Sequence, residues 1–285
     1  MKLGVWGLGS MGSGMAQSLI RTGHSVAGFD PRGVTLDGAA DLVPSEMEAA
    51  IVVVLNAAQT EAVLAEILPQ LTQGAVVVAC ATVPPDFARA MADDCAARGV
   101  HYLDAPISGG AARAAAGDLS IMASGSAAAF AAARPALDAM ARTVFEMGDA
   151  VGAGSAMKAV HQVLAGTHIA TMAEAMVFGM TQGIDPERFL EVIPQCGGTS
   201  WMLENRGPHV RDGDYTPRSA VDIWIKDLGI AADIAAPAGI DLPMMQAALD
   251  GFRRAVEMGL GGEDDAAIAK VYAAQAGVAL PGEAS

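Results

Sequence analysis

Cysteine and positive charge are both scarce in this chain of 285 residues. Its three cysteines (Cys80, Cys95 and Cys196) are an odd number without metal-ligand spacing, so we expect no disulfide framework, no metal site and a reducing, cytoplasmic compartment. Only 17 Lys and Arg stand against 32 Asp and Glu, which gives a formal net charge of -15. Because nucleic-acid affinity depends on neutralising phosphates with basic side chains, the composition argues against nucleic acid and anionic membranes as partners.

Long apolar runs are missing as well. The mean hydropathy is +0.36, but it comes from dispersed Ala, Val and Met, and a Lys, Arg, His or Asp interrupts every window of about 18 residues. The N-terminal segment lacks the n-region, apolar h-region and cleavage site of a secretory signal. These features predict a soluble globular protein of one large or two ordinary domains, at about 150 residues per domain.

The first 150 residues alternate between short β-branched runs and Ala-rich stretches. Strands separated by helices indicate βαβ units, and a continuous apolar run such as Ile51–Leu55 is typical of a parallel strand buried on both faces. After Gly148 the pattern becomes helical, beginning with a proline-free helix expected over Ser155–Gly183. We therefore predict an α/β fold, with a Rossmann-type doubly wound parallel sheet in residues 1–150. A long interdomain helix joins it to an all-α substrate and oligomerisation domain in residues 151–285.

Seven strands are expected in the first domain. They are Lys2–Gly7, Ser25–Phe29, Ile51–Leu55, Ala75–Cys80, Tyr102–Asp104, Ser120–Ser124 and Thr143–Met147. Only 21 positions separate Asp30 from Ile51, so the helix after the second strand is expected to be truncated, with Gly33 and Gly38 breaking what remains.

Three glycines at the start of the chain, Gly7, Gly9 and Gly12, have the G-x-G-x-x-G spacing. They follow an expected strand and open an expected helix, which is the context that dinucleotide binding requires. The first glycine permits the tight turn, the second lets the pyrophosphate approach, and the third lets the helix pack on the strand. Asp30 is placed to accept the adenosine ribose hydroxyls, which favours NAD, while Arg32 keeps NADP open. The alternative is a glycine-rich turn without a ligand.

The segment DAPISGG at residues 104–110 follows another expected strand. Open α/β sheets bind ligands at such strand ends, and the N–H groups of Ser108, Gly109 and Gly110 could hold a carboxylate without a cationic side chain. A tight turn without a ligand is an equally good reading of the segment by itself.

A third motif, GAGSAMK at residues 152–158, opens the long helix and ends in Lys158. His161 and Gln162 share its helix face. A desolvated lysine has a lowered pKa and exchanges a proton near neutrality, whereas most lysines lie on a helix surface. His161 either contacts substrate or is a buried histidine bonded to a carbonyl group.

Together these motifs resemble the β-hydroxyacid dehydrogenase family, which includes 3-hydroxyisobutyrate dehydrogenase and tartronate semialdehyde reductase, over nearly the whole chain. The segments that match the family patterns are Gly7–Ala16 (G-x-G-x-M-G-x-x-M-A), residues 104–110 (D-A-P-V-S-G-G), residues 152–158 (G-x-G-x-x-x-K) and Lys226–Leu228 (K-D-L).

The resemblance implies NAD as cofactor, with NADP as an option, and it implies roles for residues. Lys158 corresponds to the catalytic acid/base, and the backbone of Ser108, Gly109 and Gly110 to the binding site of the substrate carboxylate. Thr82 corresponds to a threonine that contacts the nicotinamide half, and Lys226 to a lysine that closes over the cofactor. The other cofactor contacts implied are Gly7, Leu8, Gly9, Met11, Gly12, Asp30 and Asn56.

Within the family, four segments are most similar to the L-threonate dehydrogenase branch: residues 56–64, 158–166, 200–206 and 213–222. Most relatives carry Asn-Asn three and four residues after the lysine, where this chain has His161 and Gln162. The departure weakens the case for a hydroxyisobutyrate-type substrate.

The expected function is NAD-dependent oxidation of the C2 hydroxyl of a sugar acid such as L-threonate to the 2-oxo acid. Substrate contacts are expected from His161, Gln162 and Asn205. Activity as 3-hydroxyisobutyrate dehydrogenase or tartronate semialdehyde reductase is the alternative, and an NAD-binding sensor without turnover is a further one. Because the long helix carries apolar residues on several faces, a homodimer or homotetramer is expected.

Overall fold

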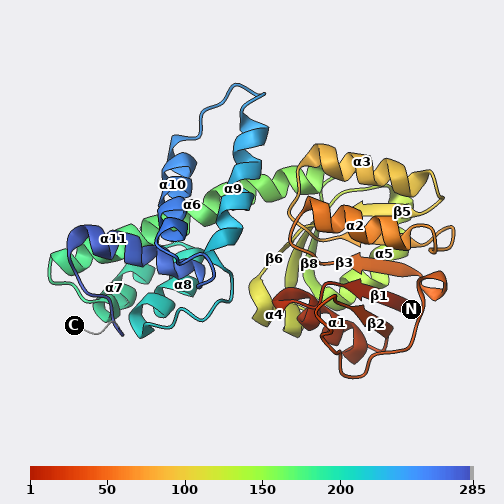
Figure 1. Ribbon diagram of the computed structural model, residues 1–285, viewed down its shortest axis with the longest axis horizontal. Helices are drawn as coiled ribbons and strands as arrows, with labels where there is room; N and C mark the ends of the chain where they lie inside the picture. Colours follow the sequence, from red (N-terminus) through yellow and green to blue (C-terminus); the bar gives the residue numbers. More distant parts are fainter. Residues whose placement is uncertain (283–285) are drawn as a thin grey trace. The chain divides into compact units, whose positions relative to one another are not determined.

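The computed structural model describes residues 1–282. Contacts within the chain divide it into two compact units, Met1–Lys158 and Ala159–Ser285. The long helix α6 (Ala153–Thr181) begins in the first unit and continues in the second (Figure 1).

The first unit contains a five-stranded parallel sheet in the order β2-β1-β3-β4-β5, which confirms the predicted Rossmann-type fold. Its strands are β1 (Lys2–Trp6), β2 (Ser25–Phe29), β3 (Ala49–Val52), β4 (Val76–Ala79) and β5 (His101–Asp104). The helices around it are α1 (Ser10–Arg21), α2 (Ala57–Ile67), α3 (Pro85–Ala96) and α5 (Ala127–Met140).

Both faces of this sheet are buried, as the apolar character of its strands predicts. Along β4, Val76 and Val78 join the core on the side of α1 and α5, while Val77 and Ala79 join the core on the side of α2 and α3. Figure 1 shows α2 and α3 side by side on that second face. Alternation with a period of two thus turns a continuous apolar run into two separate cores.

The strand order reverses beside β1, which lies between β2 and β3. In open parallel sheets, ligands bind outside the carboxyl ends of the strands at such a reversal. The loops after β1 and β3 are therefore where a ligand is expected.

A second, three-stranded sheet accounts for the last two strands expected in this unit. It has the order β6-β7-β8, with β6 (Ile107–Ser108), β7 (Leu119–Ala123) and β8 (Ala141–Glu146). β6 pairs antiparallel with β7, and β7 pairs parallel with β8. The short helix α4 (Gly110–Ala116) links β6 to β7. These strands thus form a small mixed sheet of their own beside the parallel one.

The segment between β2 and β3 is truncated as predicted. It holds one short 3-10 helix, η1 (Pro44–Glu46), in place of a full α-helix. Gly33 and Gly38 adopt positive φ angles of 71° and 75°, a backbone conformation that ends regular helix.

The second unit is helical throughout the residues described. Besides α6 it comprises α7 (Pro186–Val192), α8 (Trp201–Asp212), α9 (Val221–Ala235), α10 (Pro243–Glu257) and α11 (Ile268–Ala276), with 3-10 turns η2 (Ile193–Gln195) and η3 (Asp265–Ala267). The rings of Trp224 and Phe252 stack at 5.5 Å in its core. Gly166 lets α9 approach α6, since a Cβ there would lie 2.9 Å from the Trp224 ring. Close packing of small and aromatic residues therefore holds the central helix.

By length and composition alone, α6 could cross a membrane, with a mean hydropathy of 1.3 over its most apolar 18-residue window. Half of that window is buried inside the protein, however. A central core helix of a globular protein has this same character.

Candidate functional site

The carboxyl edge of the parallel sheet gathers the residues that the sequence motifs select in the first unit. The glycine loop follows β1, Asp30 follows β2, Asn56 follows β3, Thr82 follows β4, and the segment 104–110 begins at the end of β5. Carboxyl ends of parallel strands meet at one edge, so these residues come together although they span a hundred positions of sequence.

The glycine loop has the geometry that a dinucleotide requires. Gly7 has φ +94°, and a Cβ on it would lie 2.3 Å from the Val53 carbonyl oxygen. A Cβ on Gly12 would lie 1.8 Å from the Gly7 carbonyl oxygen, so both positions accept only glycine. Around Gly9 there is room, with Arg32 Nη2 the nearest atom at 4.0 Å. The two outer glycines hold helix against strand, while the middle one leaves the space that a pyrophosphate would fill.

Helix α1 begins directly at this space. Gly9 is its N-cap residue and supplies no side-chain acceptor, so side-chain capping does not occupy the first N–H groups of the helix. These N–H groups and the positive end of the helix dipole favour an anion at this point. Leu8 and Met11 flank the turn, and the Leu8 N–H donates to Asp30 Oδ2 at 2.8 Å.

Asp30 is held by Arg32 at the end of β2. Arg32 Nε donates to Oδ1 at 2.9 Å and Nη2 donates to Oδ2 at 2.9 Å. This bidentate contact with Arg32 holds the pKa of the Asp30 carboxyl well below its usual range. The Asp30 carboxylate is therefore ionised and held in place, as its predicted role as an acceptor of ribose hydroxyls requires. The positive charge of Arg32 is neutralised by this carboxylate.

Asn56 is placed by its role as the N-cap of α2. Its Oδ1 accepts a hydrogen bond from the Gln59 N–H at 2.9 Å. Thr82 lies three residues beyond the end of β4 and is half-buried. Both residues therefore stand at the carboxyl edge, where the motif comparison expects cofactor contacts.

The backbone of the 108–110 segment is shaped by its two glycines. Gly109 has φ +139° and Gly110 has φ +77°, values that side chains rarely permit. A Cβ on Gly110 would meet no atom within 4 Å, so open space faces it. Ser108 pairs with Ser120 in the small sheet, which fixes the start of the loop. Consecutive N–H groups in such a loop form a concave anion site without a cationic side chain.

Lys158 lies in the second turn of α6 and is only 7% exposed. The start of this helix is anchored to the end of β5, because the N–H groups of Gly152 and Ser155 both donate to the Asp104 carboxylate. The segment 104–110 and the lysine helix are thereby tied to each other within the first unit.

The other motif residues of α6 form a chain of contacts in the second unit. His161 Nδ1 is 2.8 Å from Gln162 Oε1, and the Gln162 amide donates to Asp227 Oδ2. Asp227 Oδ1 lies 2.5 Å from Lys226 Nζ. This ion pair satisfies a buried carboxylate oxygen that has no other partner. The four side chains are thus one polar network built around Asp227.

Asn205 lies on α8 and is exposed, and its Oδ1 accepts a hydrogen bond from Arg206. Arg206 in turn pairs with the buried Asp265, with Nε 2.6 Å from Oδ1. Trp224 Nε1 donates to the same carboxylate at 3.0 Å. The α8 motif therefore builds an interior ion pair, and Asn205 as a substrate contact stays a prediction.

Two acidic residues stand inside the matched motifs but were given no role from the sequence. Asp104 and Asp227 are 1% and 3% exposed, and each holds residues that the motifs had selected. The available signal was that a carboxylate within an apolar strand or helix must have partners, because charged groups are seldom buried without them.

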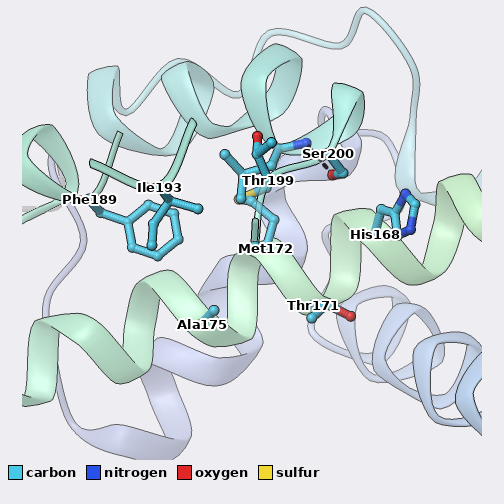
Figure 2. A pocket seen from close by; sticks show the side chains of 10 residues that line it. His168, Thr171, Met172, Ala175, Phe189, Ile193, Thr199 and Ser200 are labelled. Carbon is cyan, nitrogen blue, oxygen red and sulfur yellow. Dashed lines mark hydrogen bonds between the residues drawn. The ribbon is translucent and has the colours of Figure 1, made fainter. Parts of the chain in front are cut away.

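A pocket in the second unit is lined by none of the candidate site residues named above. It has a volume of about 330 Å³ and is shown in Figure 2. Residues from α6, α7, η2, the segment that leads into α8, and α8 line it: His168, Thr171, Met172, Ala175, Phe189, Ile193, Gly198, Thr199, Ser200 and Leu203. Within residues 1–282, no group of three or more His, Cys, Asp or Glu side chains has an arrangement that could hold a metal ion.

Comparison with known protein families gives matches across both units. Residues 2–148 match the NAD binding domain of 6-phosphogluconate dehydrogenase. Residues 152–272 match the family described as NAD-binding of NADP-dependent 3-hydroxyisobutyrate dehydrogenase.

Individual relatives cover nearly the whole chain. The sequence is 46% identical over 295 residues to L-threonate dehydrogenase of Cupriavidus necator, a match covering 99% of this chain and 98% of that protein. It is 42% identical to L-threonate dehydrogenase of Escherichia coli K12, covering 99% and 97%. A crystal structure of 3-hydroxyisobutyrate dehydrogenase from Salmonella typhimurium has 42% identity and a TM-score of 0.90, covering 95% of this chain and 99% of that one.

The Asp30 arrangement predicts how the chain chooses between NAD and NADP. Asp30→Ala removes the predicted acceptor for the ribose hydroxyls, so the Kd for NAD should rise about tenfold or more, the effect of losing a hydrogen bond to a charged group. Arg32 then loses its partner and can meet a 2′-phosphate, so relative affinity for NADP should increase. Titration of both cofactors by calorimetry measures this ratio.

The control is Asp37→Ala, which removes an exposed acid from the same loop and keeps the backbone carbonyl that Gln17 contacts. An unchanged ratio of NAD to NADP affinity in Asp30→Ala would show that Asp30 does not recognise the ribose.

Proposed function

This chain belongs to the family of NAD-binding hydroxyacid dehydrogenases that contains 3-hydroxyisobutyrate dehydrogenase, and from that membership we propose that it oxidises the C2 hydroxyl of a sugar acid to the 2-oxo acid. The substrate we propose is L-threonate. Relatives named for that acid are 40% to 46% identical to this chain.

One observation carries the chemistry. A lysine, Lys158, is buried in the second turn of a helix whose start is bonded to the end of β5, just before the glycine loop at residues 108–110. A buried amine supplies an acid/base, and a loop of N–H groups supplies a carboxylate site. A 2-hydroxy acid has a carboxylate directly beside the hydroxyl that reacts.

In the proposed reaction the N–H groups of Ser108, Gly109 and Gly110 bind the substrate carboxylate and hold C2 at the carboxyl edge of the sheet. NAD, when bound at the glycine loop, supplies the hydride acceptor. Neutral Lys158 takes the proton of the C2 hydroxyl as the hydride leaves C2, so that the 2-oxo acid, NADH and the Lys158 ammonium remain. In reverse, the ammonium returns its proton to the developing alkoxide.

Residues of the second unit are proposed to select the substrate. His161 and Gln162 stand three and four positions after Lys158 on the same helix, so their side chains project from the same helical face. Imidazole and amide groups suit the additional hydroxyls of a sugar acid, because each can donate or accept a hydrogen bond. Lys226 is proposed to close over the cofactor, with Asn205 at the far end of the substrate.

Activity on 3-hydroxyisobutyrate, or reduction of tartronate semialdehyde, is the second candidate. The similarity in fold to the Salmonella typhimurium protein named for 3-hydroxyisobutyrate favours it. The polar pair after Lys158 favours the polyhydroxylated acid instead, since imidazole and amide groups can exchange hydrogen bonds with its additional hydroxyls, which a branched aliphatic acid lacks.

We also propose limits for the two domains and a location for the protein. Residues 1–150 form the NAD-binding domain and residues 151–285 the helical substrate and oligomerisation domain, which is supported by family matches that end at 148 and resume at 152. The three cysteines are free thiols, which supports a place in the reducing cytoplasm.

The exposed face of α6 supports a homo-oligomer, either a dimer or a tetramer. Val160, Leu164 and Phe178 are 59%, 56% and 66% exposed on this helix. Leu164, the exposed Thr171 and Phe178 follow one another at intervals of seven residues, as in a stripe that packs against another helix. Aligned exposed apolar side chains of this kind mark protein interfaces.

A panel of three substrates tests the proposed specificity. With NAD in excess, we expect kcat/KM for L-threonate to exceed the values for D-glycerate and 3-hydroxyisobutyrate by about tenfold to 200-fold, since the lost hydroxyl contacts bind the transition state. The rate of NADH formation, followed at its absorbance band, gives each value. Equal or higher kcat/KM for 3-hydroxyisobutyrate would replace the first candidate with the second.

Removal of the proposed acid/base tests the mechanism. In Lys158→Ala, we expect kcat to fall at least about 100-fold, which is the contribution of a placed acid/base, while the affinity for NADH changes little. Stopped-flow kinetics and NADH fluorescence titration measure the two quantities. Lys2→Ala is the control, because Lys2 lies at the opposite, amino end of β1. Turnover at the wild-type rate in Lys158→Ala would reject Lys158 as the acid/base.

A charge placed on α6 tests the proposed interface. Leu164→Glu should lower the molar mass in sedimentation velocity to that of a monomer, because a carboxylate would have to be desolvated in the contact. Ile240→Glu adds the same charge at a residue 56% exposed outside α6, and it should leave the wild-type mass unchanged. The proposal fails if the wild-type chain is itself a monomer, or if both variants keep its mass.

A further inference from the structure

We propose that Asp104 is a positioning residue for Lys158, whose carboxylate fixes the first turn of α6 against the end of β5 and so sets the place of the lysine amine relative to the 108–110 loop. The inference rests on the proposed function, because it assigns Lys158 the acid/base role. It adds a role for an acid that contacts neither substrate nor cofactor in that mechanism.

Both oxygens of the Asp104 carboxylate accept hydrogen bonds. Oδ2 accepts from the N–H groups of Ser155 at 2.8 Å and Gly152 at 3.1 Å, and from Ser124 Oγ at 3.2 Å. Oδ1 accepts from Ser155 Oγ at 2.7 Å. Three of these four donors belong to the start of α6, so the carboxylate satisfies backbone groups that a helix start leaves without partners.

Ser124, which directly follows β7, also bonds both to Asp104 and to the start of α6. Its Oγ accepts from the Gly154 N–H at 2.9 Å, and its backbone forms a two-way bridge with Asp104, at 3.0 Å and 2.8 Å. Asp104, Ser124 and Ser155 are each 1% exposed or less. A buried network with all of its members bonded has little freedom to shift.

The two glycines of the G-x-G-x-x-x-K motif allow this approach. Gly152 has φ +98°, the conformation that carries its N–H to Asp104. A Cβ on Gly154 would lie 2.4 Å from the Met122 carbonyl oxygen and 2.8 Å from the Asp104 carbonyl oxygen. The two glycines therefore allow α6 to lie close to the end of β5. This close approach lets the start of α6 form its hydrogen bonds with Asp104 and Ser124.

Lys158 follows Ser155 by three residues in the same continuous helix. A rise of 1.5 Å per residue puts its Cα about 4.5 Å further along the axis. Any rotation or slide of the first helical turn would move the lysine with it. β5 leads directly into the 104–110 segment. The Asp104 carboxylate therefore holds Lys158 in a fixed position relative to the N–H groups that are proposed to bind the substrate.

The titratable side chains Cys80 and Tyr102 beside Asp104 are neutral, so they add no negative charge to that of its carboxylate. Cys80 and Tyr102 face it, and burial raises the pKa of the Cys80 thiol to about 12 and that of Tyr102 well above its usual value, so both are neutral. The Arg89 side chain of α3 reaches Gly152 from the other side. Burial raises the pKa of Asp104, which the hydrogen bonds from Ser155 oppose. Above that pKa, the carboxylate favours the ammonium form of Lys158.

Asp104→Asn, Ser155→Ala and Asp185→Asn test the proposal in the full-length chain. The first removes the charge and keeps the shape, and the second removes one hydroxyl and keeps the charge. The third is the matched control, because Asp185 caps α7 by accepting from the Arg188 N–H at 2.7 Å, in the other unit. NADH titration of each variant counts the folded sites, so that kcat is expressed per folded site.

Asp104→Asn and Ser155→Ala should both lower kcat and leave the affinity for NADH unchanged. We expect a loss of about tenfold in each, less than the roughly 100-fold that a full displacement of 1 Å costs. Asp104→Asn should also move the midpoint of the pH profile of kcat/KM to lower pH, because removing a buried negative charge disfavours the ammonium form of Lys158. Ser155→Ala should keep the wild-type midpoint, and Asp185→Asn should change neither quantity.

A purely structural role would give a different result. If Asp104→Asn lowers the melting temperature while kcat per folded site and the pH midpoint stay at wild-type values, the proposal is overturned. The same holds if Asp185→Asn lowers kcat as much as Asp104→Asn does.

A readout that does not need turnover separates this inference from the proposed function. Reductive methylation with 13C-formaldehyde labels the lysines, and the Lys158 signal is the one that Lys158→Arg lacks. Its titration should shift to lower pH in Asp104→Asn whatever substrate the enzyme uses. If the wild-type chain oxidises no hydroxy acid, the proposed function fails, and this titration still decides whether Asp104 acts on Lys158.

Discussion

The buried carboxylate of Asp104 is the point on which the arrangement of the first unit depends. It ends one strand of the parallel sheet, bridges to Ser124 in the small sheet, and accepts hydrogen bonds from the start of α6. Burying a charge is unfavourable unless donors surround it, and here four donors do so. Three of these donors belong to the start of α6 and one to Ser124, so the carboxylate joins the end of β5 to the start of that helix and to the end of β7.

Backbone N–H groups, which surround the Asp104 carboxylate, can also attract an anionic ligand in a chain with a net charge of -15. The glycine loop at residues 7–12 and the loop at residues 108–110 offer backbone N–H groups, whose partial charges do not depend on lysine or arginine. Arg32 in the first unit is neutralised by Asp30, and Lys226 in the second unit by Asp227, so the charge of each of these basic side chains is already balanced by an acid. Backbone N–H groups can thus attract a small anion in a chain that has few basic side chains.

Local features of the sequence predicted those parts of the fold that arise from local constraints. Gly7 and Gly12 were predicted because each excludes a Cβ through a contact that every such strand-turn-helix unit repeats. The missing helix between β2 and β3 followed from chain length alone. Pro135 and Pro208 lie inside helices α5 and α8, so no local rule places those two helices, because proline normally ends a helix.

Contacts between distant residues could not be predicted in the same way. Asp104 and Ser155 are 51 positions apart, and no periodicity records which donor a buried acid will find. Gln162 and Asp227 are 65 positions apart, so His161, Gln162 and Lys226 were predicted as separate candidates, whereas the structure joins them in one network. The motifs thus identified the candidate residues, but only the tertiary structure shows which of them bond to one another.

The most direct test of this account is a crystal structure of the chain with NADH and the 2-oxo acid derived from L-threonate. We expect the carboxylate to accept hydrogen bonds from the N–H groups of residues 108–110. We also expect Lys158 Nζ to lie within about 3.2 Å of the C2 oxygen, the reach of an acid/base. A carboxylate bound by side chains elsewhere, or a Lys158 amine turned away from C2 with the Asp104 contacts intact, would contradict it.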